Sequence, residues 1–219
     1  MTIAKADTQP TAAAVAAPPA APTTLTPWRE QLPRLVRPGV TLREPVPADA
    51  VALFTTLPPD APAQVLVDPP PASLAGFHAF VERIQAARRL GQVACWAIVP
   101  DESDVPVGII GVRAMDPHAS MVEGFAVLAQ EFRGTPLFQT VGRMVLECLF
   151  GPMRVHRAEF RVDVRNGRAN GALRKLGATQ EGLLRRARRA DGECLDQVLW
   201  AIVSTDLTQA PAARSARIH

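Results

Sequence analysis

The chain has 219 residues, with 24 Lys or Arg against 21 Asp or Glu, and 47% of its residues are apolar. This length and composition suit one domain with a full hydrophobic core and exclude a chain that is disordered throughout. No run approaches the roughly 18 uninterrupted apolar residues that a membrane-spanning helix requires, so no membrane partner is expected.

The small number of cysteines and the absence of tyrosine restrict the kinds of site and mechanism that the chain can provide. The three cysteines, Cys95, Cys148 and Cys194, are scattered and odd in number, so they form neither a disulfide framework nor a zinc motif. We therefore expect reduced thiols, a cytoplasmic location and no metal. Tyrosine is absent from the chain, and any mechanism that needs a phenol as acid or base must use another group.

Both ends of the chain are expected to be tails. Residues 1–26 consist mostly of Ala, Pro and Thr, a composition that cannot repay the entropy of ordering a chain. Prolines interrupt the apolar part of this segment, which argues against a secretory signal. The prediction is a disordered tail over residues 1–30, one domain over residues 31–207 and a flexible tail over residues 208–219.

The first half of the domain alternates between strand and helix patterns. Leu74, Phe77, Val81 and Ile84 recur at helical spacing behind Ser73, a residue type that caps helices. Apolar runs that end at turn residues predict strands. The elements expected in chain order are a strand over Val40–Arg43, a helix beginning at residues 48–49, a helix over Leu74–Leu90, and strands over Ala94–Val99, Val105–Met115 and Met121–Leu128.

The second half of the domain ends in a hairpin. Gly151-Pro152 and Gly177 are typical helix ends, and Asp191-Gly192 is a typical hairpin turn. The elements expected are a helix over Thr135–Phe150, a strand over Arg157–Val164, a helix over Arg168–Leu176, and hairpin strands over Leu183–Ala190 and Leu195–Val203. Strands and helices in this order predict a mixed α/β (α+β) fold.

The segment from Gln130 to Pro136 joins a strand directly to a helix. Such a junction directs unpaired backbone N–H groups and the positive end of the helix dipole at one point, which suits a phosphate group. The single glycine, Gly134, is weak evidence by itself, because an ordinary strand-to-helix turn explains the same residues.

Together with the motifs around it, this junction resembles the GNAT superfamily of acetyl-CoA-dependent N-acetyltransferases, and most closely the branch that acetylates ribosomal-protein N-termini. The resemblance covers residues 41–204 and rests on the order and spacing of short motifs. These are Thr41-Leu42-Arg43-Glu44-Pro45, Ala48-Asp49, Glu123-Gly124-Phe125, Arg133-Gly134, Asn166 with Leu176-Gly177, Glu181-Gly182-Leu183-Leu184-Arg185, and Asp191-Gly192 with Asp196. It implies a mostly antiparallel sheet of about seven strands with a splayed fourth strand, flanked by about four helices.

The resemblance also implies a coenzyme site. Backbone N–H groups of the loop and of the first helical turn would hold the pyrophosphate of acetyl-CoA, and the residues implied are Arg133, Gly134, Thr135, Leu137 and Phe138. The splayed strand would pair with the pantetheine arm along Val127 and Leu128, where a backbone N–H would polarise the thioester carbonyl. Pro136 departs from the family's small residue and has no N–H to donate. Asn166 would contact the coenzyme, although an asparagine there is equally well explained as a helix cap.

Glu123 is the candidate general base. It matches a family carboxylate at the start of the central strand and shares a face with Phe125 and Val127 by strand alternation. A structural strand carboxylate is the alternative. The family's two usual proton donors to the leaving thiolate are replaced by Leu173 and Ala169. Either water and Glu123 carry the protons, or the chain is a GNAT-like module that binds the coenzyme or a partner without catalysis.

The acceptor implied by the resemblance is a primary amine, on a small molecule or at a protein N-terminus. The segment from Arg154 to Arg189 holds 11 of the 24 basic residues, but Phe160 is its only Phe or Trp. Nucleic-acid binding by base stacking is therefore disfavoured. The terminal hairpin could pair between subunits, which makes a homodimer one expected arrangement.

Overall fold

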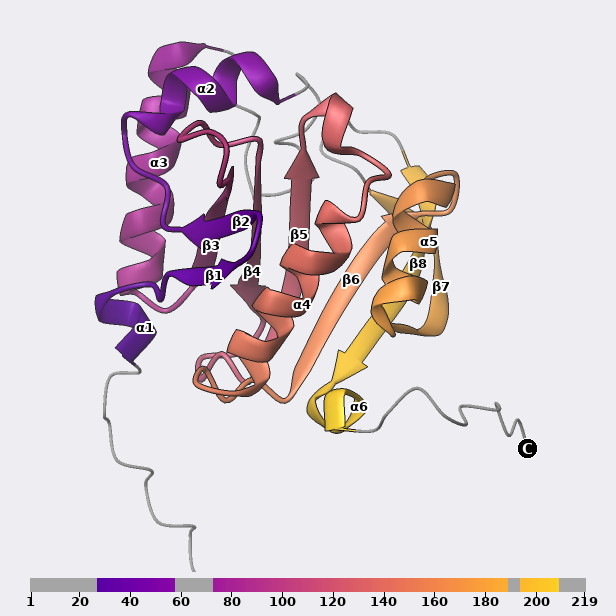
Figure 1. The fold of residues 1–219 in the computed structure, drawn as a ribbon. Coiled ribbons are helices and arrows are strands. Elements are labelled where there is room, and N and C mark those ends of the chain that lie inside the picture. Colours follow the sequence, from indigo (N-terminus) through magenta and orange to yellow (C-terminus); the bar gives the residue numbers. More distant parts are fainter. Residues whose placement is uncertain (1–26, 58–72, 189–193, 209–219) are drawn as a thin grey trace, which may run out of the picture.

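The structure, a computed structural model, describes residues 27–57, 73–188 and 194–208, and these form one sheet with helices on both faces (Figure 1). The described helices are α1 (Pro27–Glu30), α2 (Asp49–Thr56), α3 (Leu74–Arg89), α4 (Leu137–Phe150), α5 (Gly167–Leu176) and α6 (Ser204–Thr208). The described strands are β1 (Leu35–Arg37), β2 (Val40–Arg43), β3 (Val93–Pro100), β4 (Gly108–Ala114), β5 (Met121–Leu128), β6 (Arg157–Asp163), β7 (Thr179–Arg188) and β8 (Cys194–Val203).

The strand order across the sheet is β1-β2-β3-β4-β5-β6-β8-β7. Every neighbouring pair is antiparallel except β5 and β6, which are parallel. This confirms the mixed, mostly antiparallel sheet. The described residues contain eight strands because β1 forms a short hairpin with β2 around Gly39, whose φ of 90° suits a residue without a side chain. The strand expected to splay, the fourth of the expected order, is therefore β5.

β5 and β6 pair over three residues only and then separate. The paired residues are Met121–Glu123 of β5 and Arg157–Glu159 of β6. β5 remains paired with β4 as far as Leu128, whereas β6 is paired with β8 along its whole length. Figure 1 shows the two strands diverging toward the amino-terminal end of α4. The carboxyl-terminal half of β5 consequently has one edge without a strand partner.

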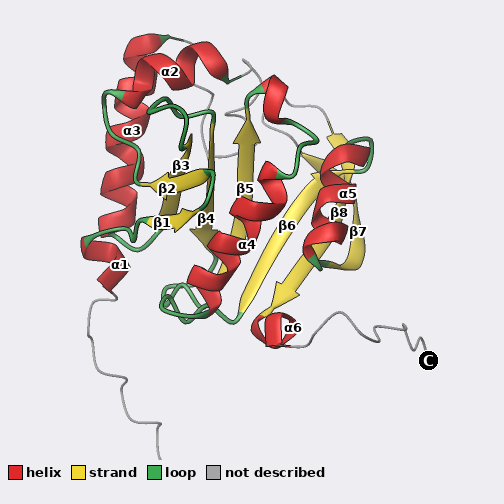
Figure 2. Ribbon diagram, in the orientation of Figure 1, coloured by secondary structure: helices red, strands yellow, loops and turns green. Residues whose placement is uncertain are grey.

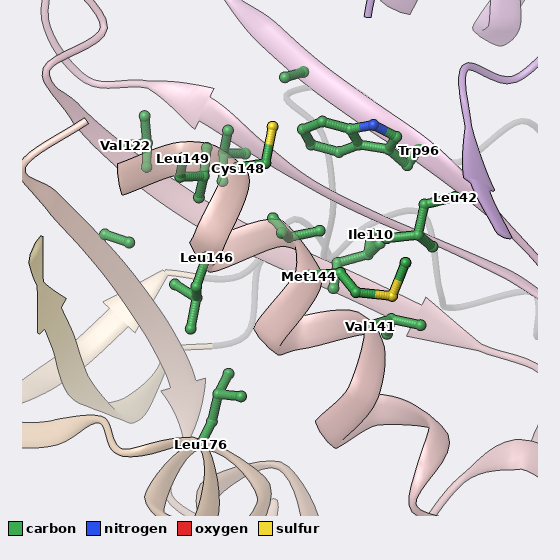
Figure 3. Close-up of a cluster of buried hydrophobic side chains, with 14 of the residues drawn as sticks. Leu42, Trp96, Ile110, Val122, Val141, Met144, Leu146, Cys148, Leu149 and Leu176 are labelled. Atoms are coloured by element: carbon green, nitrogen blue, oxygen red, sulfur yellow. The ribbon is translucent and has the colours of Figure 1, made fainter. Parts of the chain in front are cut away.

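Each face of the sheet has its own core. On the face of α4 and α5 (Figure 2), Trp96, Ile110 and Val122 of the sheet pack against Val141 and Leu149 of α4 (Figure 3). The neighbouring residues along the strands point the other way, because side chains alternate between faces. They form a smaller core with α2 and α3 that includes Leu53, Phe77, Phe80, Ile109 and Val127.

The chain joins the core earlier than expected from the sequence. Pro27–Glu30 is helical, and Trp28 is 5% exposed and part of the larger core. Arg88 of α3 holds this segment, since it donates to the carbonyl of Arg29 and to Glu44 Oε1, the latter at 2.6 Å. Four residues assigned to the tail thus lie within the fold, while residues 1–26 lie outside the described part of the chain.

Most predicted elements are present with shifted ends. Ser73 caps α3 as expected, its Oγ accepting from Gly76 N at 3.1 Å. β4 begins at Gly108 rather than at Val105, because Val105 N donates to Ser103 Oγ in a turn and Pro106 has no N–H. β7 begins at Thr179, with a register shift at Gly182 that the sequence pattern did not indicate.

Candidate active site

Glu123 lies where β5 and β6 separate. It is the last residue of β5 that pairs with β6, opposite Glu159, and it also pairs with Arg113 of β4. Its side chain is 18% exposed and lies on the same face as Val127, which belongs to the core of α2 and α3. The candidate base is therefore partly buried at the point of divergence.

Two arginines compensate the charge of Glu123. Nη2 of Arg113 donates to Glu123 Oε2. Nη1 of Arg161, on β6, is 3.8 Å from the other oxygen, Oε1, which is longer than a hydrogen bond. One carboxylate oxygen is therefore fixed by a hydrogen bond, and the other lacks a hydrogen-bond partner within the described residues.

Glu123 belongs to a longer array of ion pairs, which we call the charged row. Its members lie on β4, β5, β6 and β7, and they are Arg113, Glu123, Arg161, Glu159, Arg157 and Glu181. Arg157 donates to Glu159 Oε1 at 2.8 Å and to Glu181 Oε1 at 3.0 Å. The hydrogen bond from Arg157 holds the pKa of Glu181 below its usual value, and the two carboxylates raise the pKa of Arg157. Glu181 is thus engaged by a nearby arginine.

In the loop before α4 and the first turn of this helix, some backbone N–H groups have no hydrogen-bond acceptor within the described residues. Three of the five implied donors have partners: Arg133 N donates to Gln130 O at 3.2 Å, Thr135 N to Phe132 O at 3.4 Å, and Leu137 N to Thr135 Oγ1 at 3.3 Å. Gly134, with φ of 84°, and Phe138 donate to no acceptor in the described part of the chain. Pro136 is the N-cap residue of α4 and makes no side-chain cap. Two of the five implied N–H groups therefore remain for an anion at the positive end of α4.

The register of β5 decides which backbone groups face away from β4. Ala129 N donates to Val107 O at 2.8 Å, and in an antiparallel ladder such hydrogen-bonded pairs recur every second residue. The N–H of Val127 is therefore directed at Ile109 of β4, its partner in the register. The N–H groups of Ala126 and Leu128 are directed at the side without a strand partner. Ala126 was not among the residues singled out from the sequence, since its direction depends on this register.

A glycine and a phenylalanine occupy the base of the divergence on the α4 face. A Cβ placed on Gly124 would overlap the ring of Phe160 from β6. Phe160 is half-buried against the larger core. The sequence motif included Gly124 without explaining why the residue must be small. The explanation is the ring of Phe160 on the neighbouring strand, β6.

Asn166 caps α5. Its Oδ1 accepts from Ala169 N at 3.0 Å, and its side chain is exposed. The buried amide of this region is Asn170, which was missed in the sequence. It donates to the carbonyls of Asp163 and Asn166 and accepts from Trp200 Nε1 at 2.8 Å. Leu173, at the place of the family's phenol, is 4% exposed within the larger core.

Two further findings concern the described residues as a group. No three His, Cys, Asp or Glu side chains among them come close enough together to hold a metal ion. None of the described helices combines the length and the apolar character needed to cross a membrane.

Comparisons with known proteins agree with this arrangement. Residues 40–179 match the family described as the acetyltransferase (GNAT) domain. A solved structure described as an acetyltransferase from T. thermophilus is 28% identical, with a TM-score of 0.65 over 80% of this chain and 91% of that one. No curated protein matches the chain.

Two ligand-bound structures share the fold at lower identity. RimJ of Mycobacterium smegmatis, in complex with CoA-disulfide, is 23% identical, with a TM-score of 0.69 over 81% of this chain and 89% of that one. The microcin C7 self-immunity acetyltransferase MccE, in complex with acetyl-CoA and AMP, is 19% identical, with a TM-score of 0.66 over 76% of this chain and 93% of that one. The matched family covers more than half of the sequence, and the chain belongs to the GNAT acetyltransferase family, whose members use acetyl-CoA.

Proposed function

We propose that this protein transfers the acetyl group of acetyl-CoA to a primary amine, on a small molecule or at a protein N-terminus, by direct transfer in a ternary complex. The observation that carries the proposal is the placement of Glu123 at the divergence of β5 and β6. The unpaired edge of β5 and the free N–H groups at the start of α4 lie beyond it along the chain. The coenzyme supplies an activated acetyl group on a thiol leaving group.

The residues present fit the coenzyme in this proposal. The N–H groups of Gly134 and Phe138, with the dipole of α4, would hold the pyrophosphate. The backbone of Ala126 and Leu128 would pair with the pantetheine arm along the edge of β5. Arg133 links the two parts, because its Nε donates to Leu128 O at 2.9 Å. Asn166 would add its side-chain amide as a further contact.

Glu123 would take the proton of the amine through water. Its Oε1 is the oxygen without a hydrogen bond to the described residues, while Arg113 fixes Oε2 and so sets the direction of the carboxylate. Leu173 is apolar and buried, so the leaving thiolate would be protonated by water. Neither removal of the proton from the amine nor protonation of the thiolate then requires a phenol.

An acetylated intermediate on either of the two buried cysteines, Cys95 or Cys148, is disfavoured. Cys95 is buried in the core of α2 and α3, and Cys148 is buried on the opposite face with α4. Burial raises the pKa of the Cys148 thiol to about 11, and burial also raises the pKa of the Cys95 thiol. Neither thiol therefore supplies a thiolate nucleophile at neutral pH.

The test is release of free CoA thiol from acetyl-CoA against a panel of amines and short peptides. Glu123→Gln should lower kcat/KM about 10²- to 10⁴-fold, the usual contribution of a general base, with acetyl-CoA affinity unchanged. Glu181→Gln, in the same charged row, is the matched control and should retain most of the activity. Equal activity of E123Q and the unsubstituted protein would remove Glu123 as the base.

A second candidate is a module that binds the coenzyme or a partner without catalysis. Its support is the buried Leu173 and the missing N–H of Pro136. Calorimetry with acetyl-CoA separates the two candidates when it is combined with the thiol assay. Binding without thiol release for any amine favours the module, and turnover excludes it.

A further inference from the structure

The guanidinium of Arg161 lies beside the candidate base, Glu123, and makes no hydrogen bond within the described residues. Nη1 is 3.8 Å from Glu123 Oε1, and Nη2 is 3.7 Å from Glu159 Oε2. Both distances exceed a hydrogen bond, and within the described residues none of its guanidinium N–H groups has a hydrogen-bond acceptor. The side chain is 38% exposed. Its guanidinium therefore lies at ion-pair distance from two carboxylates and still has N–H groups that can donate to a ligand.

The carboxylates on either side of Arg161 already have arginine partners. Glu123 accepts from Arg113, and Glu159 accepts from Arg157 at 2.8 Å. Arg161 therefore adds a positive charge to a carboxylate that is already hydrogen-bonded elsewhere. Its position on β6, two residues beyond the last residue paired with β5, places this charge on the same face as Glu123.

This pairing of charges disfavours a simple cationic amine. An ammonium group that approaches Glu123 Oε1 meets the guanidinium of Arg161 at the same oxygen, and two like charges at this range repel one another. An acceptor that carries an anionic group next to its amine avoids the conflict. Its ammonium lies near Glu123, with the water that relays the proton between them, and its anionic group accepts hydrogen bonds from the guanidinium of Arg161, a charge-assisted and often bidentate arrangement.

We propose that Arg161 determines acceptor specificity and that the acceptor carries a carboxylate within a few bonds of its reactive amine. A free amino acid and a peptide with an acidic first residue both present this chemistry. The inference rests on the proposed function, because it assigns the acceptor of the same transfer reaction. In this proposal Arg161 binds the acceptor and takes no part in proton transfer.

Matched acceptor pairs test the proposal. The pairs are an amino acid and its amide, and a peptide that begins with Asp and the same peptide with Asn. The ratio of kcat/KM within each pair should favour the carboxylate form. Arg161→Gln should lower that ratio about ten- to hundred-fold, the effect of losing a hydrogen bond between charged groups. Arg161→Lys should lower it less, since the charge remains without the planar guanidinium. Arg143→Gln, on the exposed side of α4, removes the same charge elsewhere and should leave the ratio unchanged.

Acceptor binding in the presence of CoA, measured by calorimetry on the same variants, gives a readout that does not need turnover. R161Q should weaken binding of the carboxylate form and change binding of the neutral form little. Turnover without a preference, or a preference that survives R161Q, overturns the inference while the proposed function stands. If no amine releases thiol, the proposed function fails and the calorimetry decides. Weaker binding of the carboxylate form by R161Q then supports acceptor recognition, and equal binding contradicts it.

Discussion

Glu123 and Gly124 are consecutive residues of β5 with opposite surroundings. Glu123 lies among the arginines of the charged row, and Gly124 lies under the ring of Phe160 on the face of α4. One position requires a charge and the other requires the absence of a side chain. A strand achieves both with adjacent residues because its side chains alternate between faces.

Gly124→Ala should destabilise the protein. The added Cβ overlaps the ring of Phe160, which is packed against the larger core, and overpacking of this kind costs about 1–3 kcal/mol. Gly171→Ala is the matched control, because a Cβ at this position in α5 meets nothing within 4 Å. It should stabilise the helix by up to about 1 kcal/mol. Denaturant unfolding of both variants measures the two effects, and equal stability changes would contradict the overlap.

The sequence predicts residues of the site better than their orientation. Glu123 lies within β5, Gly134 in the loop before α4 and Asn166 at the cap of α5, and these are local positions that strand, loop and cap patterns predict. The direction of the Val127 N–H was not predictable, since it depends on the register between β4 and β5. Asn170 was missed for a similar reason. Its partner Trp200 is 30 residues away and meets it only in the folded chain.

At the scale of elements, the start of α4 combines a complete helix with a loop that lacks one backbone N–H donor. Pro136 has φ of −62° in the helical region, so it begins the helix without strain. It also supplies no N–H next to those of Gly134 and Phe138. The same residue thus supports the helix and removes a donor from the loop.

Pro136→Ala should tighten acetyl-CoA binding. The substitution adds an N–H at the positive end of α4, and one hydrogen bond to a charged group strengthens binding several-fold or more. Pro152→Ala, an exposed proline after α4, removes a proline away from the loop and should leave the affinity unchanged. Calorimetric titration of both variants with acetyl-CoA is the measurement, and an unchanged Kd for P136A would show that this N–H does not reach the coenzyme.

The two explanations of Asn166 can be separated at the start of α5. Asn166→Ala should cost about 1 kcal/mol because the cap on Ala169 N is lost, whereas Asn166→Ser keeps a capping oxygen and most of the stability. If the side-chain amide also contacts the coenzyme, as we propose, both variants should bind acetyl-CoA several-fold more weakly. Wild-type affinity in N166S, with stability retained, would leave Asn166 as a cap alone.

At the scale of the molecule, the charged row connects strands that belong to different parts of the chain. Arg113 precedes the α4 segment, and Glu181 follows α5. The row crosses the sheet where β5 and β6 separate, and its members compensate one another with three arginines and three glutamates. It therefore provides ion pairs across a part of the sheet where only three residues of each strand are paired.

Glu181→Gln should reduce the dependence of stability on acidic pH. The pKa of Glu181 is lowered by its hydrogen bond from Arg157, below the usual glutamate value of 4.5. A carboxylate with a lowered folded-state pKa adds stability above that usual value, and the contribution is lost as pH falls through the lowered pKa. The side chain is 35% exposed, so the effect should stay within about 1 kcal/mol. Unfolding free energies between pH 3 and 7 are the measurement, with Glu82→Gln on the exposed side of α3 as control. A difference between E181Q and the unsubstituted protein that grows as pH falls would contradict this sign.

The order of the elements and the sheet class were predictable because apolar periodicity and turn residues are local signals. The eighth strand and the docking of Trp28 were not. β1 has three residues, one of them the 64% exposed Val36, and Trp28 directly follows a segment of low-complexity composition. Only the partners of these residues, β2 and Arg88, explain their place in the fold.

The hydrogen bond from Arg133 Nε to the carbonyl of Leu128 links the loop before α4 to the end of β5. A ligand group that binds the loop and fixes its position also fixes the end of β5. A second group of the same ligand then binds a strand edge whose position is already fixed. Fragments that resemble the nucleotide half and the pantetheine half should therefore bind cooperatively, each improving the affinity of the other by the same factor.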